Sequence, residues 1–347
     1  MRILLTGASG FIGRHVVAEL AAAGGQVVGF CRSEPPVDAD LHEWLPGDVR
    51  DGAALRRALR GCTAAVHTAA HYSYDRSEAG LMHEVNVVGT RNVVEAARAT
   101  GVRRLLVTSS SATCGPVVGR PATEHDRPPS WELSIPYKRT KLLAERIALH
   151  AGGGDIEVVA VNPTTVVGPG DRKPTPSGKM IRDLVQGRII GYMHGAGINV
   201  VDVRDVARGH LLALERGRPG ERYILGGENM SLRQAFGVVA RALGRQPPWV
   251  PVPWAAVYAA ALGAERVGAL LRRPPHLLVL DEVRLARHPL FFSSEKARRE
   301  LGYAPGSAAA ALGAAAVWFA QERRDAGRGP APAGLRRPVL PRAAGQG

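Results

Sequence analysis

The sequence predicts an α/β fold in which helices cover both faces of a doubly wound parallel sheet, with a smaller mixed α/β lobe after it. Short runs of apolar and β-branched residues alternate with segments of helical periodicity through the first half of the chain. Three glycines come directly after the first of these runs, where the first helix is expected to begin. Three serines follow a later run, at the edge where open α/β sheets bind their ligands.

The expected elements of the first half alternate regularly. Strands are expected over residues 2–6, 26–31, 64–68, 105–108 and 157–162. Helices are expected over residues 11–23, 53–60, 78–99 and 137–151. Each helix can form the right-handed crossover that connects two parallel strands.

The chain is expected to form two domains, because 347 residues exceed the roughly 150 that one domain usually takes. The first covers residues 1–162. A stretch rich in proline and glycine then opens a substrate lobe over residues 163–324, from which later segments can return to the first domain. Residues 325–347, rich in arginine, proline and alanine, are expected to be a disordered tail. Helices of the second lobe are expected near residues 177–186, 205–215, 231–243, 254–271 and 307–323.

The formal net charge of +14 raises the question of a nucleic-acid partner. Only five of the 45 basic residues are lysines, and the arginines are spread over the whole chain. A surface that neutralises phosphates needs clustered positive charge. We therefore expect no nucleic-acid partner.

The cysteines and the N-terminus predict a cytoplasmic protein. Cys31, Cys62 and Cys114 form no Cys-x-x-Cys pair, which is typical of reduced thiols. No basic segment with a long apolar core and a cleavage site opens the chain, so no signal peptide is expected. The longest uncharged stretch, residues 246–264, is interrupted by prolines and is not expected to span a membrane.

The glycine-rich segment after the first strand predicts a dinucleotide site. Gly7 suits a tight turn, Gly10 lets the backbone approach a pyrophosphate, and Gly13 lets the helix pack closely on the strand. The first amides of the helix and its dipole favour an anion at this point. The residues between and beside these glycines are further candidate contacts, namely Ser9, Phe11 and Ile12.

The end of the second strand bears on which dinucleotide is bound. An NAD site usually has a carboxylate here for the ribose hydroxyls, whereas this strand ends in Cys31 and is followed by Arg32 and Ser33. A cation can pair with a 2′-phosphate, so NADP(H) is favoured over NAD(H). The alternative is that Arg32 is incidental and Glu34 binds the ribose.

Further cofactor contacts are expected at the ends of two other strands. Asp48, followed by Val49, is expected to accept a hydrogen bond from the adenine amino group, or alternatively to cap the helix that begins near Asp51. After the fourth strand, His67 and the three residues beyond it are expected to line the nicotinamide ribose. These three are Thr68, Ala69 and Ala70.

Two polar features near that strand have alternative explanations. Asn86, on the following helix, is expected to brace the catalytic loop by hydrogen bonding, or to be a satisfied core residue. His67 and His71 are four residues apart but lie on either side of a strand end, with no His-Glu-x-x-His pattern. No metal site is expected.

Tyr137 and Lys141 predict proton-transfer chemistry, because four residues of helix place both side chains on one face. A lysine ammonium stabilises a phenolate, and lowering the pKa of a phenol by about three units takes roughly 4 kcal/mol. Tyr137 can then exchange a proton with a substrate oxygen while a hydride is transferred. A hydroxyl from the run Ser109-Ser110-Ser111 is expected to orient that oxygen.

Taken together, the glycine segment, the serine run and the Tyr-x-x-x-Lys pair resemble the extended short-chain dehydrogenase/reductase (NAD-dependent epimerase/dehydratase) family. The resemblance implies a Rossmann-type sheet and places the catalytic serine on Ser110, with Ser111 as the alternative. The segment from Asn162 and Pro163 to Pro169 resembles the hopanoid-associated sugar epimerase and dihydroflavonol-4-reductase-like group. By that resemblance Pro163 is a cofactor contact, a homodimer is expected, and the pathway involves a hopanoid or another isoprenoid lipid.

Several basic residues flank the start of the second lobe, near the expected substrate entrance. They are expected to clamp a diphosphate of the substrate or to form a solvated basic surface. These are Arg172, Lys173, Lys179 and Arg204. The alanine-rich helix over residues 254–271 is expected to bury its apolar face in the second lobe, so membrane contact is at most peripheral.

The sequence therefore predicts an NAD(P)(H)-dependent oxidoreductase that transfers a hydride at a secondary alcohol or carbonyl carbon of a small molecule. Tyr137 is the expected general acid/base, Lys141 lowers its pKa and binds the ribose, and Ser110 positions the substrate oxygen. A sugar-nucleotide epimerase that keeps NAD bound uses the same triad and is the alternative. A nucleotide-sensing regulator is a second alternative, and it requires the triad to be idle.

Overall fold

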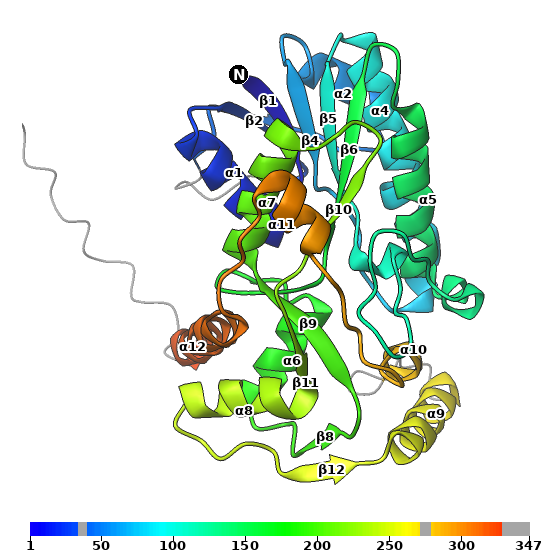
Figure 1. The fold of residues 1–347 in the computed structure, drawn as a ribbon, viewed down its shortest axis with the longest axis vertical. Helices are drawn as coiled ribbons and strands as arrows, with labels where there is room; N and C mark the ends of the chain where they lie inside the picture. Colours follow the sequence, from blue (N-terminus) through cyan, green and yellow to red (C-terminus); the bar gives the residue numbers. More distant parts are fainter. Residues whose placement is uncertain (34–39, 271–278, 328–347) are drawn as a thin grey trace, which may run out of the picture.

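The computed structural model describes residues 1–33, 40–270 and 279–327, and its centre is a seven-stranded sheet (Figure 1). The strands lie in the order β10-β6-β5-β4-β1-β2-β3, and all neighbours are parallel. Their bounds are β1 Arg2–Thr6, β2 Gln26–Cys31, β3 Glu43–Pro46, β4 Ala64–His67, β5 Arg104–Thr108, β6 Glu157–Pro163 and β10 Arg222–Leu225. The doubly wound sheet predicted from the sequence is confirmed.

Helices cover both faces of this sheet. On one face α1 (Phe11–Ala22) packs against α7 (Val203–Arg216), over a core that includes Leu5 and Leu106. On the other face α2 (Gly52–Ala58), α4 (Gly89–Ala99) and α5 (Pro136–Ala151) pack side by side over a second core. The sheet is therefore buried on both sides, which explains why its strands are continuously apolar.

The segment expected to be one helix over residues 78–99 is broken into four parts. A short 3-10 turn, Arg76–Glu78, is followed by α3 (Ala79–Met82), a π-helical segment (His83–Val88) and α4. Within the π-helical segment, the Asn86 side chain donates to the carbonyl of His71 and accepts from the amide of His71. This widened turn brings Asn86 to the loop after β4, a contact that local periodicity does not encode.

The second lobe contains two small sheets and their helices. A mixed sheet has the order β11-β9-β7, and β12 pairs with β8 beyond it. The strands are β7 Thr165–Val167, β8 Gly191–Met193, β9 Gly197–Asp202, β11 Glu228–Ser231 and β12 Val250–Val252. The helices are α6 Pro176–Val185, α8 Leu232–Ala242, α9 Trp254–Leu270, α10 Leu280–Leu285 and α12 Ala308–Gly327. Helix α11 (Glu295–Leu301) instead packs against α7 and β10 of the first sheet. A core shared by α6, α8 and α12 supports the mixed sheet.

The two lobes are connected more than once along the chain. After β9, α7 returns to pack on the first sheet, and β10 joins that sheet beside β6. Helix α12 extends to Gly327, so it includes the first residues of the segment expected to be a tail. The remainder of that segment lies outside the described residues.

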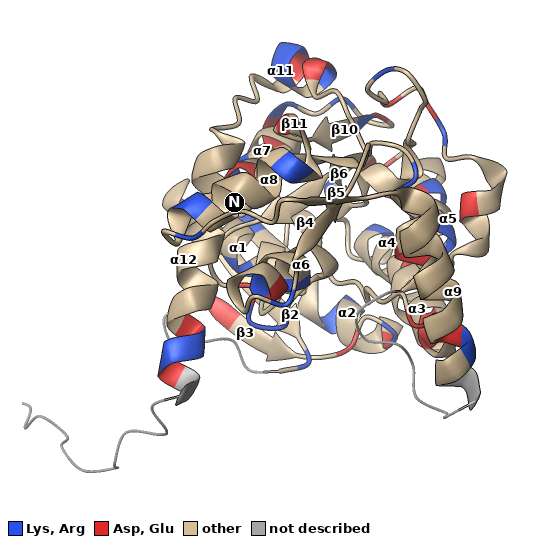
Figure 2. Ribbon diagram, turned by 90° about the horizontal axis from the view of Figure 1, so that it is seen from below, with Lys and Arg blue, Asp and Glu red and all other residues tan. Residues whose placement is uncertain are grey.

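Charges and cysteines agree with the composition. Figure 2 shows blue and red positions interspersed over the ribbon, with no single basic stripe in that view. The three cysteines are free and buried. Within the described ranges, no helix is both long enough and apolar enough to cross a bilayer.

Leu106 tests the core between the sheet and α1. It lies inside β5 and is fully buried, so Leu106→Ala should lower the free energy of unfolding by about 2–5 kcal/mol. Urea denaturation followed by circular dichroism measures the difference. Val317→Ala on the exposed side of α12 is the control and should change stability by less than about 0.5 kcal/mol. Equal losses in both variants would contradict this assignment of the core.

Candidate active site

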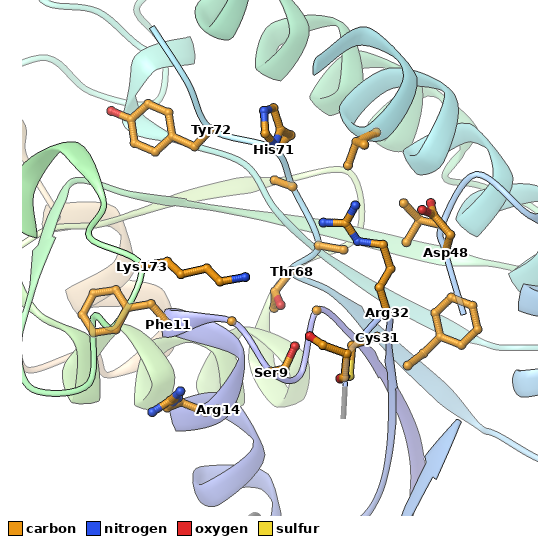
Figure 3. Close-up of a pocket in the computed structure, with 18 of the residues that line it drawn as sticks. Ser9, Phe11, Arg14, Cys31, Arg32, Asp48, Thr68, His71, Tyr72 and Lys173 are labelled. Carbon is orange, nitrogen blue, oxygen red and sulfur yellow. The ribbon is translucent and has the colours of Figure 1, made fainter. Parts of the chain in front are cut away.

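A cavity of about 620 Å³ opens at the carboxyl ends of β1, β2 and β4 (Figure 3). This is where the strand order reverses, between β1 and β4, the position at which doubly wound sheets bind ligands. The cavity walls come from the glycine loop, the end of β2, and the loops after β3, β4 and β7. The lining includes Gly7, Ser9, Gly10, Phe11, Arg14, Arg32, Asp48, Val49, Thr68, Ala69, Ala70, His71, Tyr72, Gly170, Arg172 and Lys173.

The glycine loop has the geometry that its sequence predicts. Gly7 has a φ of +75°, and a Cβ there would lie 2.8 Å from the backbone of Ala69. A Cβ on Gly13 would lie 2.1 Å from the carbonyl oxygen of Gly7, so only glycine allows α1 to approach the turn this closely. A Cβ on Gly10 would lie 3.1 Å from the same Gly7 oxygen. Gly10 itself lines the cavity. No side chain caps the start of α1, which suits an anion at this point.

The adenine end of the cavity contains Arg32 and Asp48. Asp51, not Asp48, caps α2, because its carboxylate accepts from the amides of Ala53 and Ala54. The capping alternative for Asp48 is therefore wrong. The carboxylate of Asp48 instead pairs with Arg50 at 2.7 Å, and this contact holds the pKa of Asp48 below its usual value.

Positive charge dominates the cavity walls. Arg32 and Lys173 extend into the cavity from opposite sides in Figure 3, and Arg14 and Arg172 also line it. Arg172 and Lys173 were expected near the substrate entrance. They lie in the loop after β7 and line the same cavity as the glycine loop. Arg204 lies elsewhere, paired with Asp202 at 2.6 Å. Such walls suit a ligand with several phosphate charges.

Six predicted cofactor contacts do not line this cavity. Gly13 and Ile12 serve the packing of α1, and Pro163 ends β6. Tyr137 and Lys141 lie on α5 and Asn86 lies in the π-helical segment, and none of the three lines the cavity. Arg14, Tyr72 and Gly170 line the cavity but were not predicted from the sequence; of these only Gly170 carries a signal, in the run Gly168-Pro169-Gly170.

His67 does not line the ribose site, contrary to expectation. Its two ring nitrogens bond the hydroxyls of Thr6, at 2.7 Å, and Thr90, at 3.0 Å. Burial lowers the pKa of His67 to about 3, so the ring stays neutral. His71 lines the cavity and contacts Glu78 at 3.0 Å. Among the described residues no cluster of His, Cys, Asp and Glu is arranged to hold a metal ion.

Tyr137, Lys141 and Ser110 come together at the carboxyl end of β5. Lys141 is buried and donates to the carbonyl oxygen of Thr108 at 2.7 Å, and burial lowers the pKa of its ammonium to about 8. Burial raises the pKa of Tyr137 above its usual value, and a hydrogen bond with Ser110 offsets only part of this rise, so the lowered pKa expected from Lys141 is not found. Ser111 is buried at the start of a short 3-10 helix, Ser111–Thr113. The arrangement favours Ser110 over Ser111.

Two tyrosines cover Tyr137. The ring of Tyr72 stacks on that of Tyr137 with centroids 4.0 Å apart, and Tyr74 meets Tyr137 edge to face at 6.2 Å. In the same loop Arg76 makes two hydrogen bonds of 3.0 Å with Asp281 of α10. The Tyr137 phenol is therefore enclosed by aromatic rings on a loop that is tied to α10.

Asn86 braces this region. Besides its two bonds to the backbone of His71, its amide donates to Thr140 at 3.2 Å. Thr140 stands between Tyr137 and Lys141 on α5. Asn86 therefore joins the loop after β4 to the helix that carries Tyr137 and Lys141.

The glycine turn and the cationic walls suit one kind of ligand, a dinucleotide with a pyrophosphate, and the buried Tyr–Lys pair stands at its reacting end. The fold and the site therefore define a dinucleotide-dependent oxidoreductase. Residues 3–226 match the model of the NAD dependent epimerase/dehydratase family. The chain belongs to this family.

Relatives with related names cover nearly the whole chain. A protein described as a dihydroflavonol 4-reductase from Synechocystis is 36% identical, over 91% of this chain and 93% of its own. Sterol demethylase protein B from Methylococcus capsulatus is 34% identical, over 92% and 98%. The 2-alkyl-3-oxoalkanoate reductase of Stenotrophomonas maltophilia is 32% identical, over 88% and 95%.

Solved structures share the fold over the same extent. The crystal structure of gox2253 has a TM-score of 0.80 and 37% identity, covering 93% of this chain and 98% of its own. MoeE5 in complex with UDP-glucuronic acid and NAD has a TM-score of 0.73 and 27% identity, covering 94% and 100%. The family and these neighbours support a nicotinamide cofactor.

Gly13 tests the dinucleotide site. The methyl group of Gly13→Ala would overlap the Gly7 carbonyl and push the turn out of place, so NADPH binding should weaken about tenfold or more. Isothermal titration calorimetry measures this. Gly263→Ala on α9 adds the same methyl group in open space and should bind NADPH like the parent. Unchanged binding by Gly13→Ala would contradict the role of the turn.

Proposed function

We propose that this protein is an NADPH-dependent reductase that converts a ketone to a secondary alcohol. The observation that carries the proposal is the buried group of Tyr137, Lys141 and Ser110 beside a cationic dinucleotide cavity. An acid, a cation and an orienting hydroxyl are what carbonyl reduction requires.

The cavity residues fit NADPH. The uncapped start of α1 and Gly10 suit the pyrophosphate, Arg32 suits the 2′-phosphate, and Asp48 with Val49 suits the adenine. When bound, the cofactor supplies the hydride that reduces the carbonyl carbon.

The residues of this chain supply the proton. Ser110 donates a hydrogen bond to the carbonyl oxygen and orients it toward Tyr137. Tyr137 then transfers its phenolic proton to that oxygen, which completes the alcohol. The ammonium of Lys141 stabilises the tyrosinate left behind, and solvent restores the proton.

The proposed preference for NADPH rests on Arg32. Its side chain extends into the cavity beside Asp48, whose own charge is already neutralised by Arg50. The guanidinium of Arg32 interacts electrostatically with Asp48, and it suits a 2′-phosphate better than a pair of ribose hydroxyls. A readily exchanged NADPH fits a reductase, whereas an epimerase retains its NAD.

The proposed substrate carries its ketone on an apolar skeleton. The rings of Tyr72 and Tyr74 beside Tyr137 form an apolar surface at the reacting end. Relatives named for a sterol and for an alkyl-substituted oxoalkanoate support the same substrate class. The hopanoid or isoprenoid context, the cytoplasmic location and the homodimer stay predictions.

Tyr137→Phe tests the proposed reaction. Loss of the proton donor should lower kcat for ketone reduction by about 10²–10⁴-fold, because the hydroxyl is removed and the ring retained. The Kd for NADPH should stay within about threefold, since the phenol does not line the cavity. NADPH oxidation by a panel of alkyl ketones and β-keto acids supplies the assay. Full activity in the variant would contradict the role of Tyr137, and stoichiometric NAD released from the purified protein would favour an epimerase.

Arg32→Ala tests the cofactor preference. Loss of a charge-assisted contact should raise the Kd for NADPH about tenfold to a hundredfold and leave the Kd for NADH unchanged. Arg233→Ala, which removes the same charge from exposed α8, is the control and should leave both values unchanged. Equal weakening of NADPH and NADH binding by Arg32→Ala would refute the 2′-phosphate contact.

A further inference from the structure

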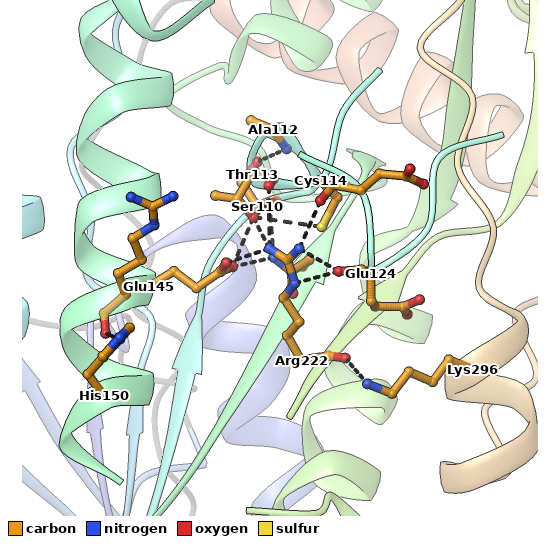
Figure 4. A network of polar contacts seen from close by, with 12 residues as sticks. Ser110, Ala112, Thr113, Cys114, Glu124, Glu145, His150, Arg222 and Lys296 are labelled. Atoms are coloured by element: carbon orange, nitrogen blue, oxygen red, sulfur yellow. Dashed lines mark hydrogen bonds and ion pairs between the residues drawn. The ribbon is translucent and has the colours of Figure 1, made fainter. Parts of the chain in front are cut away.

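A buried carboxylate lies one helical turn beyond Lys141. Glu145 of α5 is only 3% exposed, and three donors from three different segments converge on it (Figure 4). Its oxygens accept from Thr113 at 2.9 Å, from the amide of Asn162 at 2.6 Å, and from the guanidinium of Arg222 at 2.7 Å. These donors come from the loop after β5, the end of β6 and the start of β10.

Arg222 extends this network to a longer loop. Its guanidinium also donates to the backbone carbonyls of Thr113, Glu124 and Asp126. The Glu124 carboxylate in turn accepts from the amide of Ile224 at 2.8 Å. The loop from β5 to residue 126 is therefore held against β10 at several points, and Glu145 is the charge that balances Arg222.

Asn162 also reaches the backbone of the residue proposed to orient the substrate. Its amide nitrogen donates one proton to the carbonyl of Ser110 at 3.1 Å and the other to Glu145. The single proton of the Thr113 hydroxyl goes to the Glu145 carboxylate at 2.9 Å. Ser110 is thus joined to Glu145 through Asn162, and the loop that carries Ser110 is joined to Glu145 through Thr113.

We infer that Glu145 is a positioning residue whose carboxylate ties the loop carrying Ser110 to the helix carrying Tyr137. The inference rests on the proposed reduction and adds a residue that touches neither cofactor nor substrate. Ser110 and Tyr137 lie on different segments, and their hydroxyls must meet on one substrate oxygen. Misplacement by about 1 Å costs roughly 10²-fold in rate, so a fixed link between the segments is a catalytic requirement.

Glu145 also acts on Lys141 electrostatically. Burial lowers the pKa of the lysine, and the negative charge of Glu145 raises it. The other groups around Lys141 are Tyr137, on its own helix, and His67 of β4, which stays neutral. The buried Glu132–Lys138 pair at the start of α5 balances its own charge. Glu145 is therefore the anion that helps keep Lys141 protonated near neutral pH.

A merely structural ion pair gives a different expectation. Removing one partner of a buried ion pair leaves the other charge uncompensated and lowers stability, but a purely structural role predicts no change in kcat or its pH profile for the protein that stays folded. A positioning role predicts effects on the rate and its pH dependence that exceed any effect on NADPH binding. These effects can be separated by kinetics.

Glu145→Gln is the first variant to test, because glutamine keeps the shape and removes the charge. We expect kcat for ketone reduction to fall about tenfold or more, while the Kd for NADPH stays within about threefold. In the parent, kcat should decline above about pH 8, where Lys141 loses its proton and no longer stabilises the tyrosinate. In Glu145→Gln this decline should begin at a lower pH, because the negative charge that raises the pKa of Lys141 is removed.

Thr113→Val is a gentler second variant that leaves every charge in place and serves if Glu145→Gln does not fold. It removes the hydrogen bond that ties the loop carrying Ser110 to Glu145, so kcat should fall while the decline above about pH 8 stays where it is in the parent. Glu95→Gln on exposed α4 removes the same charge as Glu145→Gln and should leave kcat and its pH profile unchanged.

Hydrogen–deuterium exchange tests the link without a substrate. In Glu145→Gln and Thr113→Val, amides of residues 109–126 should exchange faster, while those of β1 and β2 keep the rates of the parent. A parent protein that is inactive toward every ketone would refute the proposed function. The exchange rates would still test whether Glu145 ties the loop carrying Ser110 to α5. An active parent whose kcat, pH profile and exchange are unchanged in both variants would overturn the inference.

Discussion

The close approach of α1 to the turn after β1 is the constraint on which the site depends. With Gly13 set against the Gly7 carbonyl, the first amides of α1 have a fixed distance and direction relative to the sheet. The ends of β2 and β4 flank β1 in parallel register, so one anchored turn also places Arg32 and Thr68. A small change at this contact therefore moves the whole floor of the cavity, although no side chain is involved.

Much of the first domain could be predicted because its signals are local. The bounds of β1 and β2 follow directly from uninterrupted apolar runs that end at residues unsuited to a buried strand. Tyr137 and Lys141 could be paired from spacing alone, since one helical turn separates them. The features that could not be predicted depend on contacts between residues distant in the sequence. Asn86 in the π-helical turn contacts His71, and the ring of Tyr72 stacks on that of Tyr137, and no local periodicity pairs either set of residues.

The second lobe was harder to interpret for a related reason. Arg172 and Lys173 lie about 160 residues beyond the glycine loop, and their place in the dinucleotide cavity follows from a loop that crosses back over the sheet. Arg222 and Glu145 are 77 positions apart and meet only when β10 joins the sheet beside β6. No periodicity or motif in the sequence predicts either of these placements. Contacts between residues that are distant in the sequence are therefore the hardest to predict from the sequence.

The ion pair between Arg76 and Asp281 has a mechanical consequence. It joins the loop that carries Tyr72 to α10, while Tyr137 belongs to a helix of the first domain. The ring stacked on Tyr137 is therefore coupled to the position of α10, through Tyr72, Arg76 and Asp281. A change in the spacing between α10 and the first sheet would act directly on the packing around the Tyr137 phenol.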